Sequence, residues 1–517
     1  GQVSFEYGTT SGSYTTQTSA FTATVDEPVE TVFSGLSSDT QYFYRMRYRA
    51  TSGDEWLNGT EHSFQTQRVR GESFTFTVSS DSHLGDTFSG IDPDRYEATT
   101  VNIANDDPDF HLDLGDAFVM NSPTNQDQAD EIYLAQRPFF GNFSHSAPVF
   151  LAIGNHENEE GWNLDDTPFS KALGSITARK KYFLNPVTDA FYSGNDDPLP
   201  TAYGGGYRED YYAWEWGDAL FVVLDPFQYT MTKPYENDPF NENETETGDQ
   251  WDWTLGIDQY MWFKETLENS TAPYKFVFAH HMLGGVPYLS VGGADAGYVR
   301  GGAEAAPYFE WGGQNEDDTY GFTVERPSVT WGADPIHQIM LDNNVTIFFH
   351  GHDHQFVHEI RDGITYQEVP SSSMTGYGFD LYDDSPYAVS GGNLPNAGHL
   401  RIDVTADLAT VRYVRAAIAG DTGITNGSVS YTYTVTPSVA GERLNGDANR
   451  DSSINSTDAL VILSYDVGLD VPYTIDACSD INGDGFVNST DALAILSNDA
   501  GITVPFPIGG ICTLPQG

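Results

Sequence analysis

The sequence predicts a multidomain protein in which a β-rich N-terminal domain and a small helical C-terminal unit flank an α/β core. Three observations support this division. Residues 1–68 alternate apolar and polar side chains, residues 69–437 contain short apolar runs with helical segments between them, and residues 444–502 contain an internal repeat. A tail, 503–517, follows the repeat.

The composition is that of a folded, strongly acidic protein. Of the 517 residues, 39% are hydrophobic and 14% aromatic, which is too much apolar surface for a chain that stays unfolded. The 75 Asp and Glu against 23 Lys and Arg give a formal net charge of −52, which repels nucleic-acid phosphates and attracts divalent cations. We therefore expect no direct nucleic-acid binding, and no apolar run reaches the roughly 18 residues of a transmembrane segment.

Two features favour an extracellular or cell-surface location. Cys478 and Cys512 are the only cysteines, and we expect a disulfide between them, with two free thiols as the alternative. Sequons for N-glycosylation are also frequent. They begin at Asn58, Asn142, Asn243, Asn269, Asn344, Asn426, Asn455 and Asn488.

Residues 1–68 are expected to form half-buried antiparallel strands, because apolar and polar residues alternate over 3–7 and 41–48. The stretch SGLSSDTQYFYRMRYRA, followed by HSFQTQ, resembles the fibronectin-type-III-like β-sandwich that precedes the catalytic domain in purple acid phosphatases. The resemblance covers only the later strands. The opening strands are either missing from this chain or supplied by another chain through strand addition.

Six apolar runs in residues 69–437 are predicted to be strands that are buried on both faces of a sheet. They are SFTFTVSS, DFHLDL, APVFLAI, ALFVVL, YKFVFA and VTIFFH. Helical segments at 257–267 and 334–341 lie between them, so the core is α/β. The acidic stretches at 226–252 and 290–330, which are rich in Gly and Asn, are predicted to be surface loops.

Residue types that bind metals follow five of these strands, at the point where each strand ends. They are Asp81 and His83, Asp116, Asn155 and His156, His280 and His281, and His352 and His354. Because ligands bind beyond the carboxyl ends of strands in open α/β sheets, we expect these segments to converge. Imidazole and carboxylate ligands suit Fe, Zn or Mn, and one carboxylate can bridge two cations.

The order Asp-x-His, Gly-Asp, Gly-Asn-His-Glu, His, Gly-His-x-His resembles the calcineurin-like metallophosphoesterase superfamily over residues 72–415. The resemblance implies a four-layer α/β/β/α core that hydrolyses phosphate monoesters or diesters at two transition-metal ions. It also implies two sets of ligands that share one carboxylate: Asp81, His83 and His354 for one metal, Asn155, His280 and His352 for the other, and Asp116 between them.

The same resemblance implies that a metal-bound hydroxide attacks phosphorus while His156 protonates the leaving alkoxide as general acid, a contribution on the order of 10²- to 10⁴-fold. His281 is the second candidate for that role, and His350 is undecided. In purple acid phosphatases a Tyr stands three residues after the bridging Asp, where this chain has Val119, and a Gly stands in place of His83. We therefore predict no tyrosinate-to-iron absorption band, and no purple colour, even with iron bound.

The C-terminal repeat has a period of 33 residues, because Asp447 corresponds to Asp480. Each copy places oxygen ligands at positions 1, 3, 5, 7 and 12 of a calcium loop. These are Asp447, Asn449, Asp451, Ser453 and Asp458 in the first copy, and Asp480, Asn482, Asp484, Phe486 and Asp491 in the second. Ser453 and Phe486 would contribute backbone carbonyls, and the sharp-turn position holds Gly485 only in the second copy, with Ser452 in the first.

One helix after each loop, with Asp at position 12, resembles a dockerin over residues 444–502, a small EF-hand-like unit. The resemblance implies two calcium ions and a cohesin-like partner, or alternatively a neighbouring subunit, that docks on the repeated Ser-Thr pairs Ser456, Thr457, Ser489 and Thr490. A glycan on Asn455 or Asn488 would crowd the same surface. The sequence thus favours a secreted, tethered phosphoesterase; the alternative is a calcium-dependent surface or filament component whose phosphatase domain is ancillary or inactive.

Overall fold

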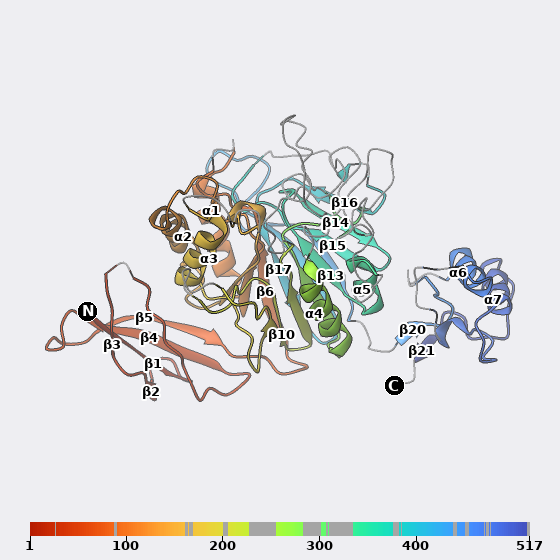
Figure 1. Ribbon diagram of the computed structural model, residues 1–517, viewed down its shortest axis with the longest axis horizontal. Helices are drawn as coiled ribbons and strands as arrows, with labels where there is room; N and C mark the ends of the chain where they lie inside the picture. The colour runs from red at the N-terminus through yellow and green to blue at the C-terminus, as the bar shows by residue number, and fades with distance from the viewer. Residues whose placement is uncertain are drawn as a thin grey trace.

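The computed structural model describes residues 1–25, 27–86, 90–160, 164, 169–199, 205–226, 255–282, 301–304, 306, 309, 334–375, 382–383, 385–437, 442–449, 454–469, 471, 475 and 477–513. Figure 1 shows an N-terminal sheet, a central body and a C-terminal helical unit. Most of the surface loops predicted at 226–252 and 290–330 lie outside the described residues. No helix in the described ranges is both long and apolar enough to cross a membrane.

The N-terminal region is one antiparallel sheet of five strands. They are β1 (Gln2–Gly8), β2 (Thr16–Gln17), β3 (Phe21–Thr22), β4 (Gln41–Arg49) and β5 (Leu57–Gln65), in the order β2-β1-β4-β5 with β3 also on β1. Aromatic rings cover one face, where Tyr7 stacks on Phe33 with ring centroids 4.4 Å apart. The Tyr44 hydroxyl donates to the backbone carbonyl of His145 at 2.6 Å, which ties the sheet to the core. The predicted strands are confirmed, whereas the fibronectin identity stays a prediction.

The six apolar runs form strands, as predicted, and divide between two mixed sheets. One sheet has the order β19-β18-β17-β6-β7-β8, and the other has the order β16-β14-β15-β13-β12-β11-β10-β9. The first contains β6 (Phe74–Ser79), β7 (Phe110–Asp113), β8 (Val149–Leu151), β17 (Gly398–Val404), β18 (Ala409–Arg415) and β19 (Val429–Val435). The second contains β9 (Ser193–Gly194), β10 (Tyr212–Trp216), β11 (Ala219–Val223), β12 (Tyr274–Phe278), β13 (Ile347–His350), β14 (Phe356–Arg361), β15 (Ile364–Glu368) and β16 (Ala388–Leu394).

The sheets pack face to face over an aromatic core, in which the rings of Phe76 and Phe221 lie 5.1 Å apart, edge to face. Helices cover the two outer faces (Figure 1). They are α1 (Pro93–Asn105), α2 (Gln126–Phe140) and α3 (Lys171–Tyr182) on the first sheet, and α4 (Gly256–Asn269) and α5 (Ile336–Asp342) on the second. The core therefore has four layers, α/β/β/α, and β6, β7, β8, β12 and β13 run parallel within their sheets.

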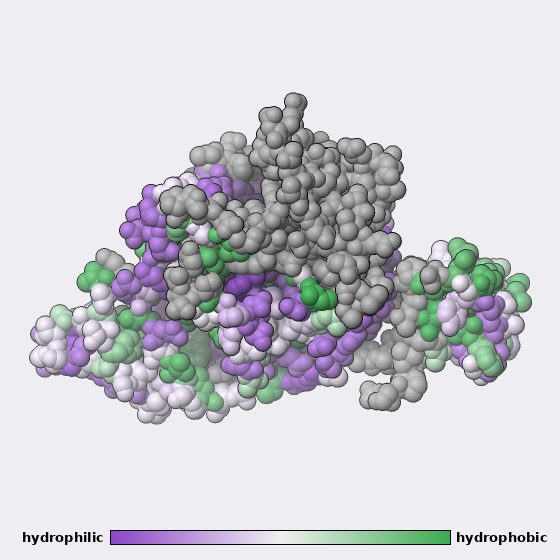
Figure 2. Space-filling view, in the orientation of Figure 1, coloured by the Kyte–Doolittle hydropathy of each residue, from purple (hydrophilic) through white to green (hydrophobic). Residues whose placement is uncertain are grey.

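The C-terminal unit consists of α6 (Ser456–Asp466) and α7 (Ser489–Asp499), with a short hairpin of β20 (Glu442–Leu444) and β21 (Ile511–Thr513). Each helix supplies a cap to the other. The Ser456 backbone N–H donates to Asp499 Oδ2 at 3.1 Å, and the Ser489 N–H donates to Asp466 Oδ2 at 2.9 Å. Apolar side chains gather on the surface of this unit (Figure 2).

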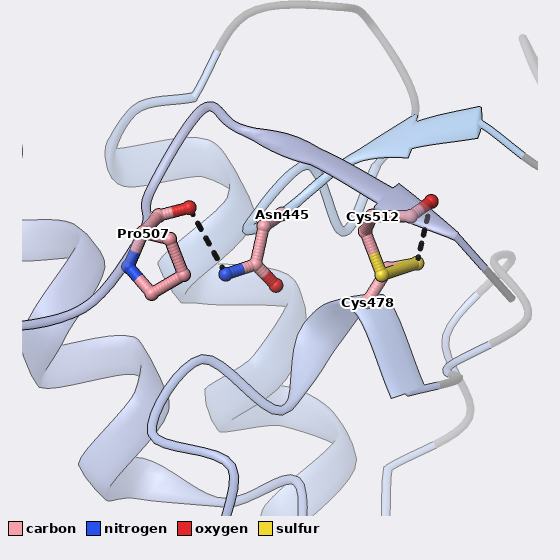
Figure 3. The surroundings of a disulfide bond; sticks show 4 residues. All are labelled: Asn445, Cys478, Pro507 and Cys512. Atoms are coloured by element: carbon pink, nitrogen blue, oxygen red, sulfur yellow. Dashed lines mark hydrogen bonds between the residues drawn. A yellow bond between two sulfur atoms is a disulfide. The ribbon is translucent and has the colours of Figure 1, made fainter.

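A disulfide between Cys478 and Cys512 joins β21 to the turn before the second repeat (Figure 3). Next to it, the Asn445 side-chain amide donates to the Pro507 carbonyl at 3.1 Å, and the Gly446 N–H donates to the Cys478 carbonyl at 2.9 Å. The tail that follows the repeat is thus fixed to the residues at which the repeat begins. No free cysteine is present.

Candidate metal centre

The five motif segments lie together at the carboxyl ends of their strands. Backbone hydrogen bonds tie neighbouring segments to one another within each sheet. The Asp81 N–H donates to the Gly115 carbonyl at 3.0 Å, and the Gly351 N–H donates to the His280 carbonyl at 2.7 Å. The structure therefore brings the side chains that follow β6, β7, β8, β12 and β13 into one buried place.

The first group contains Asp81, His83 and His354, all of which are buried. The Nε2 atoms of His83 and His354 are 3.0 Å apart. Asp81 Oδ1 lies 3.3 Å from His354 Nε2 and 3.5 Å from His83 Nε2. Two imidazole nitrogens and a carboxylate oxygen that face one point are the donor set of a transition-metal site.

The second group contains Asp116, His280 and His352, whose ligand atoms lie within 4.8 Å of one another. Asp116 Oδ2 is 3.1 Å from His280 Nε2 and 3.6 Å from His83 Nε2, so this carboxylate lies between the two groups. The Nδ1 atom of His280 lies 2.9 Å from the Leu114 carbonyl, which leaves Nε2 facing the group.

Two buried oxygen atoms indicate that the centre fits cations. Asp81 Oδ1 and Asn155 Oδ1 have no hydrogen-bond partner within the described part of the chain. Burying such an acceptor without a partner costs about 1–3 kcal/mol, a cost that a coordinated cation removes. Together with the imidazoles, these atoms give nitrogen and oxygen donors for a pair of metal ions.

Without cations, the histidines compensate the charge of the carboxylates. Burial disfavours a charged imidazole at His83, but Asp81, Asp86 and Asp116 outweigh it and raise its pKa to about 10. The same balance, with Asp116 as the main partner, raises the pKa of His280 to about 9. Metal binding therefore displaces protons from these rings.

The backbone is strained at five of the predicted ligands. The φ angles are +54° at Asp81, +46° at His83, +53° at Asp116, +75° at His352 and +66° at His354. Non-glycine residues in this left-handed region cost of order 1–3 kcal/mol each and occur mainly where function requires them. The strain lets each strand end turn its side chain sharply toward the centre.

Glycine is required at two positions in the motifs by close approach. A Cβ at Gly154 would lie 2.4 Å from Asp116 Oδ1, and a Cβ at Gly351 would lie 2.1 Å from Ser80 Oγ. Both contacts are too short for any side chain. The sequence showed these glycines, but their function appears only in the packed structure.

Glu157, to which the sequence motifs gave no role, supports the turn that carries Asp116. Its carboxylate accepts backbone N–H groups from Gly154 at 2.7 Å, Asp116 and Ala117 at 3.0 Å, and Phe118 at 2.9 Å. Three of these donors, at 116–118, belong to the turn that carries Asp116. Its place after His156 in the Gly-Asn-His-Glu motif was the available signal.

The structure separates the three histidines whose roles the sequence left open. His156 lies at the rim, with 16% of its side chain exposed, and its backbone N–H donates to Asp116 Oδ1 at 2.7 Å. His281 is buried, with its ring 4.8 Å from that of His352. His350 lies against a different group, with Nδ1 2.5 Å from Glu368 Oε2.

The calcium loops are only partly described, because Asp451 and Ser453 lie outside the described residues. In the second loop, Asp480 accepts the N–H groups of Asp484 at 3.1 Å and Gly485 at 2.8 Å. Asp491 Oδ1 accepts the Asn482 N–H at 3.0 Å. In the first loop, Asp458 Oδ1 accepts the Asn449 N–H at 3.1 Å, and Asp447 is buried.

Residues 74–356, more than half of the chain, match the sequence model of the calcineurin-like phosphoesterases, and residues 445–498 match the dockerin type I domain. The fold is similar to that of PhoD, with a TM-score of 0.54 and 15% identity, covering 86% of this chain and 84% of that chain. It is also similar to purple acid phosphatase PPD1 from yellow lupin (Lupinus luteus), with a TM-score of 0.52 and 13% identity, covering 85% and 70%. None of the curated proteins matches the chain. The chain belongs to the calcineurin-like phosphoesterase family and is a metal-dependent phosphoester hydrolase with a C-terminal dockerin region.

Proposed function

We propose that this protein is a secreted enzyme that hydrolyses phosphate monoesters or diesters at two metal ions and is held on a partner by its dockerin. One observation carries the catalytic part: imidazoles and carboxylates from four strand ends gather in two buried groups, and Asp116 lies between them. The proposed boundaries are 1–68 for the N-terminal domain, 69–437 for the catalytic domain and 444–502 for the dockerin.

In this proposal, each residue group would hold one cation. Asp81, His83 and His354 would hold the first metal, Asn155, His280 and His352 would hold the second, and Asp116 would contact both. Fe, Zn or Mn fits these donors. When bound, such ions neutralise phosphoryl oxygens and make water a nucleophile at neutral pH.

The chain itself would supply the proton for the leaving group. His156 is the better placed histidine, because it lies at the exposed rim, whereas His281 is buried beside His352. As the phosphorus–oxygen bond breaks, the His156 imidazolium would give its proton to the departing alkoxide.

The dockerin part of the proposal is supported by the surface of α6 and α7. Ser456, Thr457, Ser489 and Thr490 are exposed. Leu460 and Leu493, one on each helix, are both 63% exposed and belong to the apolar surface of this unit, and contiguous apolar surface is typical of interaction sites (Figure 2). We propose that a cohesin-like partner covers this surface when calcium fills both loops.

The test is hydrolysis of p-nitrophenyl phosphate and of bis(p-nitrophenyl) phosphate by the metal-loaded full chain, with and without a chelator. On phenyl phosphate, whose leaving group needs protonation, His156→Ala should lower kcat about 10²- to 10⁴-fold, and the loss on the p-nitrophenyl esters should be much smaller. His145→Ala, an exposed histidine outside the centre, is the matched control and should keep full activity. Full activity of His156→Ala on phenyl phosphate would exclude it as general acid, and inactivity of the parent on all of these esters would favour a calcium-dependent surface component.

A further inference from the structure

Asp86 lies beside the metal centre but belongs to none of the five motifs. Its N–H donates to the His83 carbonyl at 2.9 Å, which closes a tight turn over residues 83–86. Gly85 has φ +94° within this turn, a conformation that side chains disfavour. The turn folds the Asp86 carboxylate back toward the His83 ring.

One carboxylate oxygen of Asp86 faces the Nδ1 atoms of both His83 and His156. Asp86 Oδ2 lies 3.8 Å from His83 Nδ1 and 3.6 Å from His156 Nδ1. Only 8% of the Asp86 side chain is exposed, and the two rings lie 4.7 Å apart, nearly perpendicular. A buried carboxylate is thus shared by a proposed metal ligand and the proposed general acid.

The orientations of the His83 and His156 rings determine which of their atoms face the Asp86 carboxylate. His83 directs Nε2 toward Asp81 and His354, so its Nδ1 carries the hydrogen and faces Asp86. At His156, Asn121 Nδ2 lies 3.2 Å from Nδ1 as well. The amide can donate to Nδ1 of the neutral ring, whereas the carboxylate forms an ion pair with the protonated ring at 3.6 Å.

We infer that Asp86 is a positioning residue that orients His83 for metal binding and His156 for proton donation, an inference that rests on the proposed role of His156. As the phosphorus–oxygen bond breaks, the Nε2 proton of His156 passes to the departing oxygen. Asp86 keeps its negative charge throughout and orients the His156 ring by its charge, from 3.6 Å.

The test compares Asp86→Asn with the parent on two monoesters that differ in leaving group. Phenyl phosphate releases a phenol with a pKa of about 10, which needs protonation, whereas p-nitrophenol leaves readily without it. We expect kcat of Asp86→Asn to fall about 10²- to 10³-fold on phenyl phosphate and much less on p-nitrophenyl phosphate. Asp94→Asn, which removes an exposed carboxylate from the same part of the chain, should change neither.

A second readout does not depend on activity. Asp86→Asn should lose its metals at a chelator concentration about 10- to 100-fold lower than the parent, as measured by elemental analysis after dialysis. Retention equal to that of the parent overturns the inference for His83.

A double-variant cycle tests the link to His156. In the His156→Ala background, Asp86→Asn should cause no further loss on phenyl phosphate. A further loss there, or equal losses on both esters in the single variant, overturns the inference for His156. If His156→Ala itself shows no dependence on the leaving group, the proposed general acid is wrong, and metal retention still decides the role of Asp86 at His83.

Discussion

At the scale of single residues, the metal centre contains side chains that hold the predicted metal ligands in position through hydrogen bonds to their backbone. Glu157 gathers four backbone N–H groups around the turn that carries Asp116. That turn is strained, since Asp116 has a positive φ angle, and strain persists only where the surroundings enforce it. Glu157 provides that enforcement.

Replacing Glu157 by Gln should therefore affect both stability and turnover. The amide keeps one acceptor oxygen and places an NH₂ group against buried N–H donors, so we expect the free energy of unfolding to fall by about 1–3 kcal/mol. We also expect kcat to fall, because Asp116 loses its fixed position. Urea unfolding and steady-state kinetics measure the two effects. Glu131→Gln, an exposed position on α2, is the control, and an unchanged kcat in Glu157→Gln would contradict the role.

His358, which lies outside the metal centre, should make the free energy of unfolding depend on pH. Its ring stacks on Tyr433 with centroids 3.8 Å apart, and burial lowers the pKa of its imidazole to about 4. The unfolded chain has the ordinary value of about 6.5. Between these values the unfolded state takes up a proton that the folded state does not, so stability falls as the pH falls from 6.5 to 4.

The measurement is the free energy of unfolding of the parent and of His358→Gln across that pH range. Both lose stability as other groups titrate, but the parent should lose more. Above pH 6.5 the difference between the two should be constant. Parallel curves throughout would contradict the assignment.

At the scale of elements, the apolar runs were sufficient to predict the six central strands, because strands buried on both faces leave an uninterrupted apolar signal. Strands β17 to β19 alternate apolar and polar residues, and their pairing beside β6 follows from long-range contacts that no local pattern contains. Helices α1 to α3 were not individually predicted, because their apolar residues share the stripe with buried polar residues such as Thr99 and Arg179.

In the candidate site, too, some residues could be predicted from the sequence and others could not. The motif residues could be named from the sequence, because each follows a strand and has metal-ligating chemistry. Asp86 could not, because its approach to His156 depends on how two distant turns pack. The left-handed backbone at Asp81 and His354 is likewise a property of the packed sheets.

The disulfide gives a prediction for the C-terminal unit. Cys478 and Cys512 are separated by 34 residues, a loop for which a cross-link contributes about 3–4 kcal/mol. The Cys478→Ser/Cys512→Ser variant should therefore expose α7 to faster hydrogen exchange at a fixed calcium concentration. Exchange in the catalytic core should not change, which serves as the internal control. Equal rates in the variant and the parent would show that the hairpin of β20 and β21 holds the tail alone.

At the scale of the whole molecule, the catalytic core and the repeat, which carry the two proposed kinds of cation site, are separate parts of the fold (Figure 1). The catalytic centre offers imidazole nitrogen, whereas the repeat offers oxygen alone. A calcium-selective chelator should thus loosen α6 and α7 and leave kcat unchanged. A chelator selective for transition metals should abolish hydrolysis and leave the repeat ordered. Circular dichroism and ester hydrolysis on the same sample separate the two effects, and loss of kcat with the calcium-selective reagent alone would contradict this independence.

The exchanged caps of α6 and α7 have a consequence for the repeat. Each loop leads into a helix whose start depends on the final Asp of its neighbour, Asp499 for one and Asp466 for the other. If one loop loses its calcium ion and the helix after it becomes less ordered, the start of the other helix loses a hydrogen-bond acceptor. We therefore expect the two loops to bind calcium cooperatively, so that a titration of the full chain with calcium gives a steeper curve than two independent sites would give.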